Sequence, residues 1–345
     1  MAQRVLVTGA DTFWGGRMIQ ALETDPNLEM ILGMGAHAPS VPFERAEFVR
    51  AEENYSIVNR IVKATQVDTI LHTFMVTNSA GISNRRVHEI NVIGTMNLLA
   101  AAGASGSSVR HIVVKSSTLV YGSSAADPNT FGEDTPRSAP ATHGIERTLL
   151  EAESLVRDFS EDNPGTLVTV LRFANVLGPH LTTAISRSLS RPFCPSIFGF
   201  DPLLQFVEED DVVRSLLHVT RGGIPGLYNV AGEGRLPWSE VADICGTRLV
   251  PLSPYSPLRI HPLVRLFDLP PELGDLLRYG RGVDTRRFAA TGFVYRATSA
   301  GAVQSFIRAK RLQRAAGRTP TSYTYEHDVE QFFRHSPSVT GPPGT

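Results

Sequence analysis

Gly9 and Gly15 could help to bind a phosphate group, because they lie where a strand is expected to turn into a helix. The apolar run from Arg4 to Thr8 has the length of a buried strand, Gly9 interrupts it, and a helical pattern begins at Phe13. Such a turn directs backbone N–H groups and the positive end of a helix dipole at one spot, which suits an anion. A purely structural turn has the same pattern, so this stretch needs support from the rest of the chain.

The composition is that of a soluble globular protein, with 42% hydrophobic and 19% charged residues in a chain of 345. That length predicts one large domain or two intertwined ones. The net charge of -1 gives no reason to expect nucleic acid or an anionic membrane as a partner. Cys194 and Cys245 are too few and too isolated for a disulfide framework, and they suit a reducing compartment. Without a signal peptide or an apolar run long enough to span a membrane, the cytoplasm is expected.

Apolar runs of strand length alternate with helical patterns along the first two thirds of the chain, which favours an α/β fold with a parallel sheet. Four strings in this region carry a resemblance to a known family. They are T-G-A-D-T-F-W-G at 8–15, N-V-I-G-T-M-N-L-L at 91–99, S-S-T-L-V-Y-G at 116–122 and L-R-F-A-N-V-L-G-P at 171–179.

These strings resemble the motifs of extended short-chain dehydrogenase/reductases, the NAD-dependent epimerase/dehydratases. The resemblance is dense from Arg4 to Gly232 and patchy to about Phe293. It implies a Rossmann-type doubly wound parallel sheet with a smaller C-terminal substrate-binding part. Residues 1–175 would form the dinucleotide-binding domain, to which 206–232 return. Residues 176–205 and 233–335 would form the substrate-binding part, and 336–345 a loose tail.

The family implies NAD or NADP as the cofactor, but several expected contacts are changed. Thr12 stands in place of the middle glycine of the turn, and a β-branched residue tolerates positive φ poorly. The second strand, Glu29–Met34, is followed by Gly35 instead of the acidic residue that binds the adenosine ribose, so the preference for NAD or NADP stays open. The resemblance assigns cofactor contacts to Gly9, Thr12, Phe13, Gly15, Glu52, Asn91 and Arg147.

Two residues beside the expected cofactor groove are larger than their family counterparts. Phe74 and Met75 follow the fourth strand, where the family keeps small residues. Their side chains could narrow the groove or turn into the core. Glu52 could contact the adenine, or it could be a solvated carboxylate at a helix start.

The catalytic residues implied by the resemblance are Ser117, His143 and Arg147. In the family, a tyrosine and a lysine one helical turn apart complete the site with the serine. Here His143 stands for the tyrosine and Arg147 for the lysine. Imidazole can exchange protons near neutral pH, and a neighbouring cation would favour its neutral form. An ordinary surface helix capped by Thr142 explains the segment equally well, which would leave a degenerate site.

The resemblance also implies a small-molecule substrate, with a nucleotide sugar as a candidate. Asn175 corresponds to an asparagine that contacts the substrate diphosphate, whereas Leu204 replaces an arginine that pairs with a phosphate. The acidic run Glu208–Asp211 is interpreted as the capped start of a helix, and no metal site is expected. A homodimer through the helices at Asn91 and Gly144 is what the family would imply.

Three hypotheses follow from this pattern. The first is an enzyme that oxidises and re-reduces a sugar hydroxyl, with Ser117 binding the substrate and His143 transferring the proton. The second is a dinucleotide-binding protein without turnover that serves as a sensor or a partner-binding module. The third is a chain whose groove no longer takes a dinucleotide, because of Thr12, Phe74 and Met75.

Overall fold

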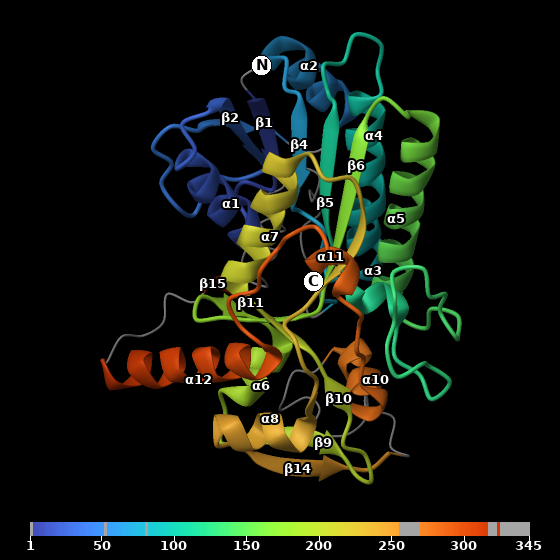
Figure 1. The fold of residues 1–345 in the computed structure, drawn as a ribbon, viewed down its shortest axis with the longest axis vertical. Helices are drawn as coiled ribbons and strands as arrows, with labels where there is room; N and C mark the ends of the chain where they lie inside the picture. Colours follow the sequence, from blue (N-terminus) through green and yellow to red (C-terminus); the bar gives the residue numbers. More distant parts are fainter. Residues whose placement is uncertain (1–2, 52–53, 80–81, 255–269, 317–322, 325–345) are drawn as a thin grey trace, which may run out of the picture.

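A seven-stranded sheet forms the centre of the molecule (Figure 1). The computed structural model describes residues 3–51, 54–79, 82–254, 270–316 and 323–324. Every pair of neighbouring strands in this sheet runs parallel, in the order β12-β6-β5-β4-β1-β2-β3. The strands are β1 (Gln3–Thr8), β2 (Leu28–Gly35), β3 (Glu47–Arg50), β4 (Thr69–His72), β5 (His111–Ser117), β6 (Leu167–Phe173) and β12 (Gly226–Val230).

The strand order reverses between β1 and β4. In open α/β sheets, ligands bind at such a reversal, just outside the carboxyl ends of the strands. The Rossmann-type doubly wound sheet predicted from the sequence is therefore confirmed. β12 completes one edge beside β6, although it follows β6 only after a long excursion of the chain. The expected domain boundaries stay a prediction, and the tail 336–345 lies outside the described residues.

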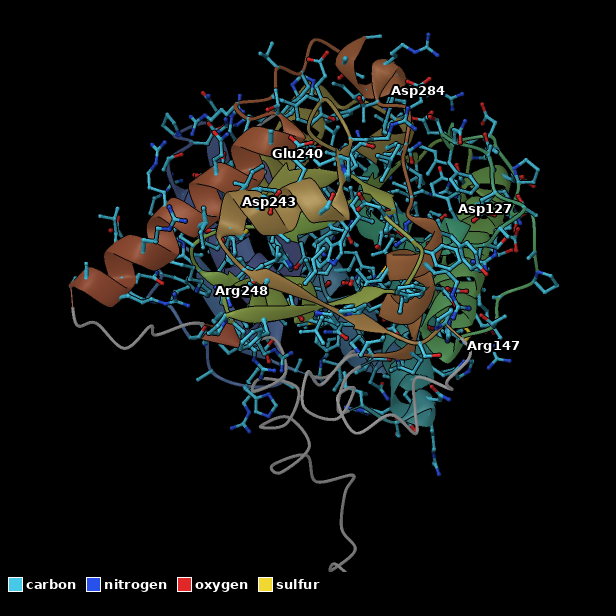
Figure 2. The ribbon with its side chains drawn as sticks, turned by 90° about the horizontal axis from the view of Figure 1, so that it is seen from below. Asp127, Arg147, Glu240, Asp243, Arg248 and Asp284 are labelled. Carbon is cyan, nitrogen blue, oxygen red and sulfur yellow. The ribbon has the colours of Figure 1, made fainter. Side chains whose placement is uncertain are left out.

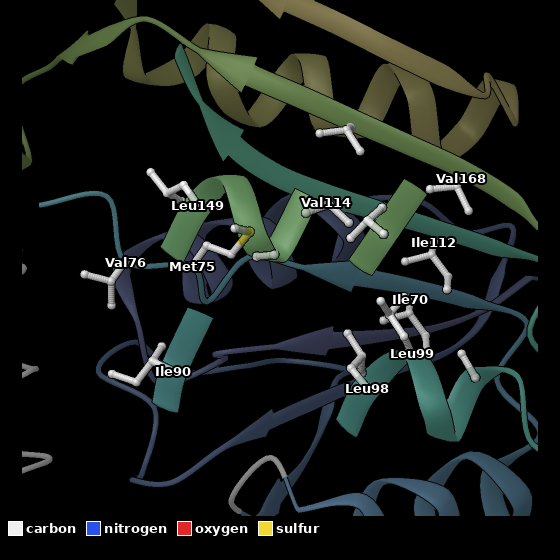
Figure 3. Close-up of a cluster of buried hydrophobic side chains, with 14 of the residues drawn as sticks. Ile70, Met75, Val76, Ile90, Leu98, Leu99, Ile112, Val114, Leu149 and Val168 are labelled. Atoms are coloured by element: carbon white, nitrogen blue, oxygen red, sulfur yellow. The ribbon is translucent and has the colours of Figure 1, made fainter. Parts of the chain in front are cut away.

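Helices cover both faces of the sheet. One face carries α2 (Tyr55–Thr65), α4 (Thr95–Ala102) and α5 (Gly144–Asp162), and the other carries α1 (Phe13–Glu23) and α7 (Glu209–Gly222). Figure 3 shows the first of these cores, in which Leu98 of α4 and Leu149 of α5 pack toward Ile112 and Val114 of β5. Because β5 is covered on both faces, six of its seven residues are buried, as is typical of a central parallel strand.

A smaller part of the molecule lies beyond the carboxyl ends of the sheet (Figure 1). Its core surrounds the buried side chains of Trp238 and Phe306. Its main elements are α6 (Ala184–Leu189), β9 (Phe193–Ile197), α8 (Trp238–Cys245), β14 (Arg248–Leu252), α10 (Pro271–Tyr279) and α12 (Ser299–Ala315). The shorter elements of the chain are α3 (Asn84–His88), η1 (Glu89–Gly94), η2 (Thr118–Tyr121), β7 (Asn175–Leu177), β8 (Leu181–Thr182), β10 (Leu203–Leu204), β11 (Phe206–Glu208), β13 (Leu236–Pro237), α11 (Arg286–Ala289) and β15 (Tyr323–Thr324). Among the described residues, none of the helices is long and apolar enough to cross a membrane.

Candidate functional site

Two cavities lie near the carboxyl edge of the sheet. The first, here called the α1–β2 cavity, has a volume of about 320 Å³. It is lined by Gly9, Asp11, Met34, Gly35, Ala36, Ala51, Asn54, Phe74, Arg86, Glu89, Ile90, Ile93, Gly94 and Asn97. The second, here called the β5–β6 cavity, has a volume of about 140 Å³. Its lining includes Trp14, Thr77, Asn78, Lys115, Ser116, Ser117, Phe173, Asn175, Thr182, Thr183, Glu272, Leu273, Leu276 and Arg281.

The N-terminus of α1 lies between these cavities. Gly9 and Asp11 of the glycine turn reach the α1–β2 cavity, and Trp14 in the first helical turn reaches the β5–β6 cavity. The turn is tight, because a Cβ atom at Gly15 would collide with the carbonyl of Gly9. Gly9 itself has a φ of +68°, which favours glycine. This arrangement leaves a helix N-terminus next to both cavities, which suits an anion.

Thr12 causes no strain in this turn, contrary to the concern raised by its sequence position. Its φ is −89°, so the residue is extended and needs no left-handed backbone. Thr12 is the N-cap of α1: its Oγ1 accepts from the Gly15 N–H at 3.3 Å and donates to the Gly9 carbonyl at 2.7 Å. The expected penalty was wrong because the middle position of this turn serves as a helix cap. Phe13, the next residue, is buried against Trp14.

Asp11 is a site residue that the sequence patterns did not single out. Its Oδ2 accepts from the backbone N–H of His37 at 2.9 Å and contacts His37 Nδ1 at 3.3 Å. A Cβ atom at Gly35 would collide with the Asp11 carboxylate. The Asp11 side chain therefore fills the space above the end of β2, where the family motif carries its acidic residue.

The two bulky residues after β4 have different surroundings. Met75 is buried in the core between the sheet and α4, so it does not narrow the groove. Phe74 lines the α1–β2 cavity and its Cβ lies close above Gly9. Asn54, which caps α2, lines the same cavity. Glu52 lies outside the described residues, so its contact with an adenine stays a prediction.

Ser117 lines the β5–β6 cavity at the end of β5. Its Oγ accepts from the Leu119 N–H at 3.2 Å, which caps η2 and leaves the hydroxyl proton for another acceptor. Lys115, two residues earlier, lines the same cavity with its Nζ 5.1 Å from the centre of the Trp14 ring. Burial lowers the pKa of Lys115 to about 8, which brings its amine close to a useful range for proton exchange.

His143 and Arg147 are not brought together with Ser117 in the same cavity lining. His143 is the N-cap residue of α5, the place that the sequence analysis gave to Thr142, and its Nε2 contacts Asp275 Oδ2 of α10 at 2.8 Å. The hydrogen bond to Asp275 raises the pKa of His143, so the expectation that Arg147 would favour a neutral imidazole was wrong. Arg147 is exposed at the margin of the molecule (Figure 2). The catalytic roles of both residues stay predictions.

Replacing Asp275 with asparagine should lower the pKa of His143. The carboxylate stabilises the protonated imidazole, and an amide of the same shape removes that charge. The measurement is an NMR pH titration of the imidazole resonances in both proteins. A pKa of His143 that is equal in the variant and the wild type would contradict the ion pair. His88, whose imidazole is half exposed near Glu151, provides an internal control whose resonances should be the same in both proteins.

One amide and one cationic side chain, Asn175 and Arg281, line the β5–β6 cavity. Asn175 lines it from β7, with its Nδ2 donating to the Gln205 carbonyl at 3.0 Å. Leu204, in the place of the missing arginine, is fully buried. Its backbone forms a bridge with Arg281, which lines the cavity. A buried arginine, Arg281, therefore lies beside Leu204, the position at which the family motif has an arginine.

Arg281 is poorly neutralised for a buried cation. Its Nη1 donates to the Gly122 carbonyl at 3.1 Å, and its Nε has no hydrogen-bond partner among the described residues. Burial lowers the pKa of Arg281 to about 10, so the guanidinium is still charged at neutral pH. A buried charge without a paired carboxylate is costly unless an anion approaches it.

Asn91 supports the site from behind. It is fully buried in η1, where its Oδ1 accepts from the Val76 N–H at 2.7 Å and its Nδ2 donates to the Val76 carbonyl at 2.9 Å. The same Nδ2 donates to Thr148 of α5 at 3.3 Å. Asn91 therefore fixes the segment after β4 relative to α5, and its contact with a cofactor stays a prediction.

The acidic run Glu208–Asp211 forms the N-cap and first turn of α7, and the side chain of the N-cap residue makes no capping hydrogen bond. The four carboxylates have separate partners. Glu208 accepts from Ser305, Glu209 contacts His180, Asp210 pairs with Arg17, and Asp211 pairs with Arg214. Within the described part of the chain, no three His, Cys, Asp or Glu side chains are grouped so that they could hold a metal ion.

The site residues that the motifs did not predict have only weak signals in the sequence. Lys115 interrupts an apolar strand, which is an uncommon place for a charge and could have been noticed. Asp11 lies inside the glycine turn, but its direction depends on the missing Cβ of Gly35. Glu272 of α10 lines the β5–β6 cavity and accepts from Ser79, so α10 helps to cover the site. This glutamate belongs to the Pro-rich and apolar stretch Pro251–Leu277 of the sequence. Residues 255–269 of that segment lie outside the described residues.

Comparisons with known proteins agree with this architecture. The model of the NAD dependent epimerase/dehydratase family matches residues 5–231. The chain is 34% identical over 319 residues to the uncharacterized protein Rv0501 of Mycobacterium tuberculosis. The aligned region covers 89% of this chain and 84% of that relative. The solved structure of MoeE5 in complex with UDP-glucose and NAD has a TM-score of 0.69 at 20% identity, covering 90% of this chain and 99% of that one. UDP-glucose 4-epimerase of Thermotoga maritima with UDP-glucose has a TM-score of 0.68 at 18% identity, covering 90% and 100%.

Proposed function

Since the chain belongs to the NAD dependent epimerase/dehydratase family, we propose that it binds NAD or NADP and acts on a nucleotide sugar by reversible hydride transfer. The observation that carries this proposal is the position of the α1 N-terminus between two cavities. A dinucleotide has the matching shape, with two nucleosides joined by a pyrophosphate. The glycines keep the turn tight, since a Cβ atom at Gly15 would collide with the Gly9 carbonyl, and the pyrophosphate would then lie against the helix N-terminus.

The substrate part of the proposal rests on the cation in the β5–β6 cavity. Arg281 and Asn175 would bind the diphosphate of a nucleotide sugar, the guanidinium by charge and the amide by hydrogen bonds. Two of the structural relatives bind UDP-glucose, which has this chemistry. The loss of the arginine at Leu204 is thereby compensated by a residue from another segment.

The nicotinamide supplies a reversible hydride acceptor when it is bound. The chain's own residues then have two tasks. Ser117 would donate a hydrogen bond to the reacting oxygen of the sugar and orient it, without transferring its proton. A base would take the proton of that hydroxyl while the C–H hydride leaves, which yields a ketone. His143 and Lys115 are the candidates, and Lys115 is the one that lines the cavity.

The hydride half-reaction tests this function. The nucleotide-loaded protein is mixed with UDP-glucose and UDP-glucuronic acid deuterated at the reacting carbon, and the deuterium content of the reduced nicotinamide is measured by mass spectrometry. The proposal expects deuterium transfer, with a loss in Lys115→Met or His143→Ala identifying the base. If neither variant changes the transfer, both assignments of the base fail. If no sugar nucleotide transfers deuterium to the wild-type protein, the enzymatic function fails.

A second function, binding of a dinucleotide without turnover, is favoured by one observation. Arg147 is exposed and lies outside the lining of both cavities, so the cation that the family uses beside the nicotinamide ribose is displaced. A protein of this kind would serve as a sensor or partner-binding module. It would retain a bound nucleotide and give no deuterium transfer in the experiment above.

We also propose a homodimer through α4 and α5. Met96 on α4 is 43% exposed, which is high for a large apolar side chain on a helix that packs against the core. Sedimentation equilibrium should give twice the mass of one chain, and Met96→Glu should shift the protein toward the monomer. A wild-type protein that sediments as a monomer at micromolar concentration would contradict this interface.

A further inference from the structure

The Asp11 carboxylate has an oxygen that the rest of the chain does not use. The side chain is 9% exposed, and Oδ1 has no hydrogen-bond partner among the described residues. The other oxygen, Oδ2, accepts from the backbone and ring nitrogens of His37. A buried carboxylate oxygen without a partner is costly, and it marks a place where a donor from outside the chain would be stabilising.

The residue that carries this oxygen lines the α1–β2 cavity. Asp11 lines the cavity together with Gly35 and Ala36, the residues at the end of β2. The absence of a side chain at Gly35 is what admits the Asp11 carboxylate, since a Cβ atom there would collide with it. His37 then holds the carboxylate over this position from the other side.

From this geometry we infer that Asp11 binds the adenosine ribose hydroxyls of the dinucleotide and selects NAD over NADP. The inference rests on the proposed function, because it needs a dinucleotide in the α1–β2 cavity. Two vicinal hydroxyls can both donate to a carboxylate, and the unpartnered Oδ1 offers the acceptor. A 2′-phosphate would bring a second negative charge to the same carboxylate, so NADP should bind less well.

One cation in the cavity could favour the opposite preference. Arg86 also lines the α1–β2 cavity and could attract a 2′-phosphate. Its Nη1, however, donates to Glu89 at 3.0 Å, so a carboxylate already neutralises this guanidinium. The charge next to Gly35 is therefore that of Asp11.

The assignment is tested by the affinities for NAD and NADP, measured by isothermal titration calorimetry on protein freed of bound nucleotide. Wild-type protein should bind NAD about 10-fold or more tightly than NADP, because NAD keeps the hydrogen bonds to the carboxylate and NADP brings a phosphate against it. Asp11→Asn keeps the shape and removes the charge. It should weaken NAD binding and remove most of the preference.

A compensating variant separates this role from a loss of folding. In Asp11→Ala the NAD affinity should fall, and adding Gly35→Asp should restore it, because the space that the Asp11 side chain occupied is then free for the new side chain. Asp158→Asn, an exposed change on α5, is the matched control and should leave both affinities unchanged.

The measured affinities test the role of Asp11 separately from the proposed function. Binding of NAD and NADP with a ratio that is the same in wild type and Asp11→Asn would overturn the role of Asp11 and leave the proposed function standing. Tighter binding of NADP by the wild type would also overturn it. Failure of the wild type to bind either nucleotide would overturn the proposed function and this assignment with it.

Discussion

Replacing Arg172 with leucine is expected to lower the free energy of unfolding by about 3–5 kcal/mol, because it leaves a buried carboxylate without its partner. The Arg172 and Glu153 side chains are 12% and 9% exposed, and the two side chains form a close ion pair between β6 and α5. The same guanidinium donates to the Tyr121 hydroxyl at 2.8 Å and to the Glu133 carbonyl at 3.2 Å. Glu153 also accepts from Ser116 of β5.

Urea denaturation of the variants measures this effect. Arg85 provides the matched control, since it pairs with Glu89 on the surface with its side chain 90% exposed. Arg85→Leu should cost no more than about 1 kcal/mol. The double variant Arg172→Leu/Glu153→Leu should recover part of the loss, because it removes the isolated charge. If Arg172→Leu lowered the free energy of unfolding no more than Arg85→Leu does, the ion pair would not be important for stability.

Arg281→Met is expected to weaken the binding of a nucleotide-sugar diphosphate by about 10- to 100-fold, the value of one or two hydrogen bonds to a charged group. Methionine fills a similar volume without the charge. The affinity for NAD should be unchanged, because Arg281 lines the β5–β6 cavity and the α1–β2 cavity is formed by other residues.

Calorimetric titration of UDP-glucose into the NAD-loaded protein measures this change. Arg286→Met is the matched control, because Arg286 is exposed and pairs with Asp284 outside the cavity. Equal losses of UDP-glucose affinity in the two variants would point to a long-range charge effect. No loss in Arg281→Met would remove the main support for a nucleotide sugar as the substrate.

Much of the fold could be predicted from the sequence because it rests on local patterns. Strand-length apolar runs separated by helical patterns predict parallel strands covered on both faces, and the sheet confirms this. The motif strings also predicted the positions of Ser117 and Asn175 at the carboxyl ends of strands, where both line one cavity. Local patterns suffice here because each of these residues is placed by its own strand.

The chemistry of the site depends on contacts between distant segments, which local patterns do not contain. The proposed role of Arg281 in place of the arginine expected at Leu204 depends on the bridge between their backbones. Asp11 reaches the end of β2 only because Gly35 has no side chain. His143 contacts Asp275 of a helix whose position the sequence did not predict. A motif taken by itself does not show which residues of other segments lie beside its substituted positions.

The central claim is that the α1 N-terminus holds the pyrophosphate of a dinucleotide between the two cavities. Its most direct test is to denature the purified protein, identify any released nucleotide by mass spectrometry, and titrate NAD and NADP into the emptied protein. We expect the denatured protein to release NAD or NADP, or the emptied protein to bind one molecule of it per chain. We also expect that Gly15→Ala, which brings a Cβ atom against the Gly9 carbonyl, prevents rebinding. Emptied wild-type protein that binds neither nucleotide would contradict the claim.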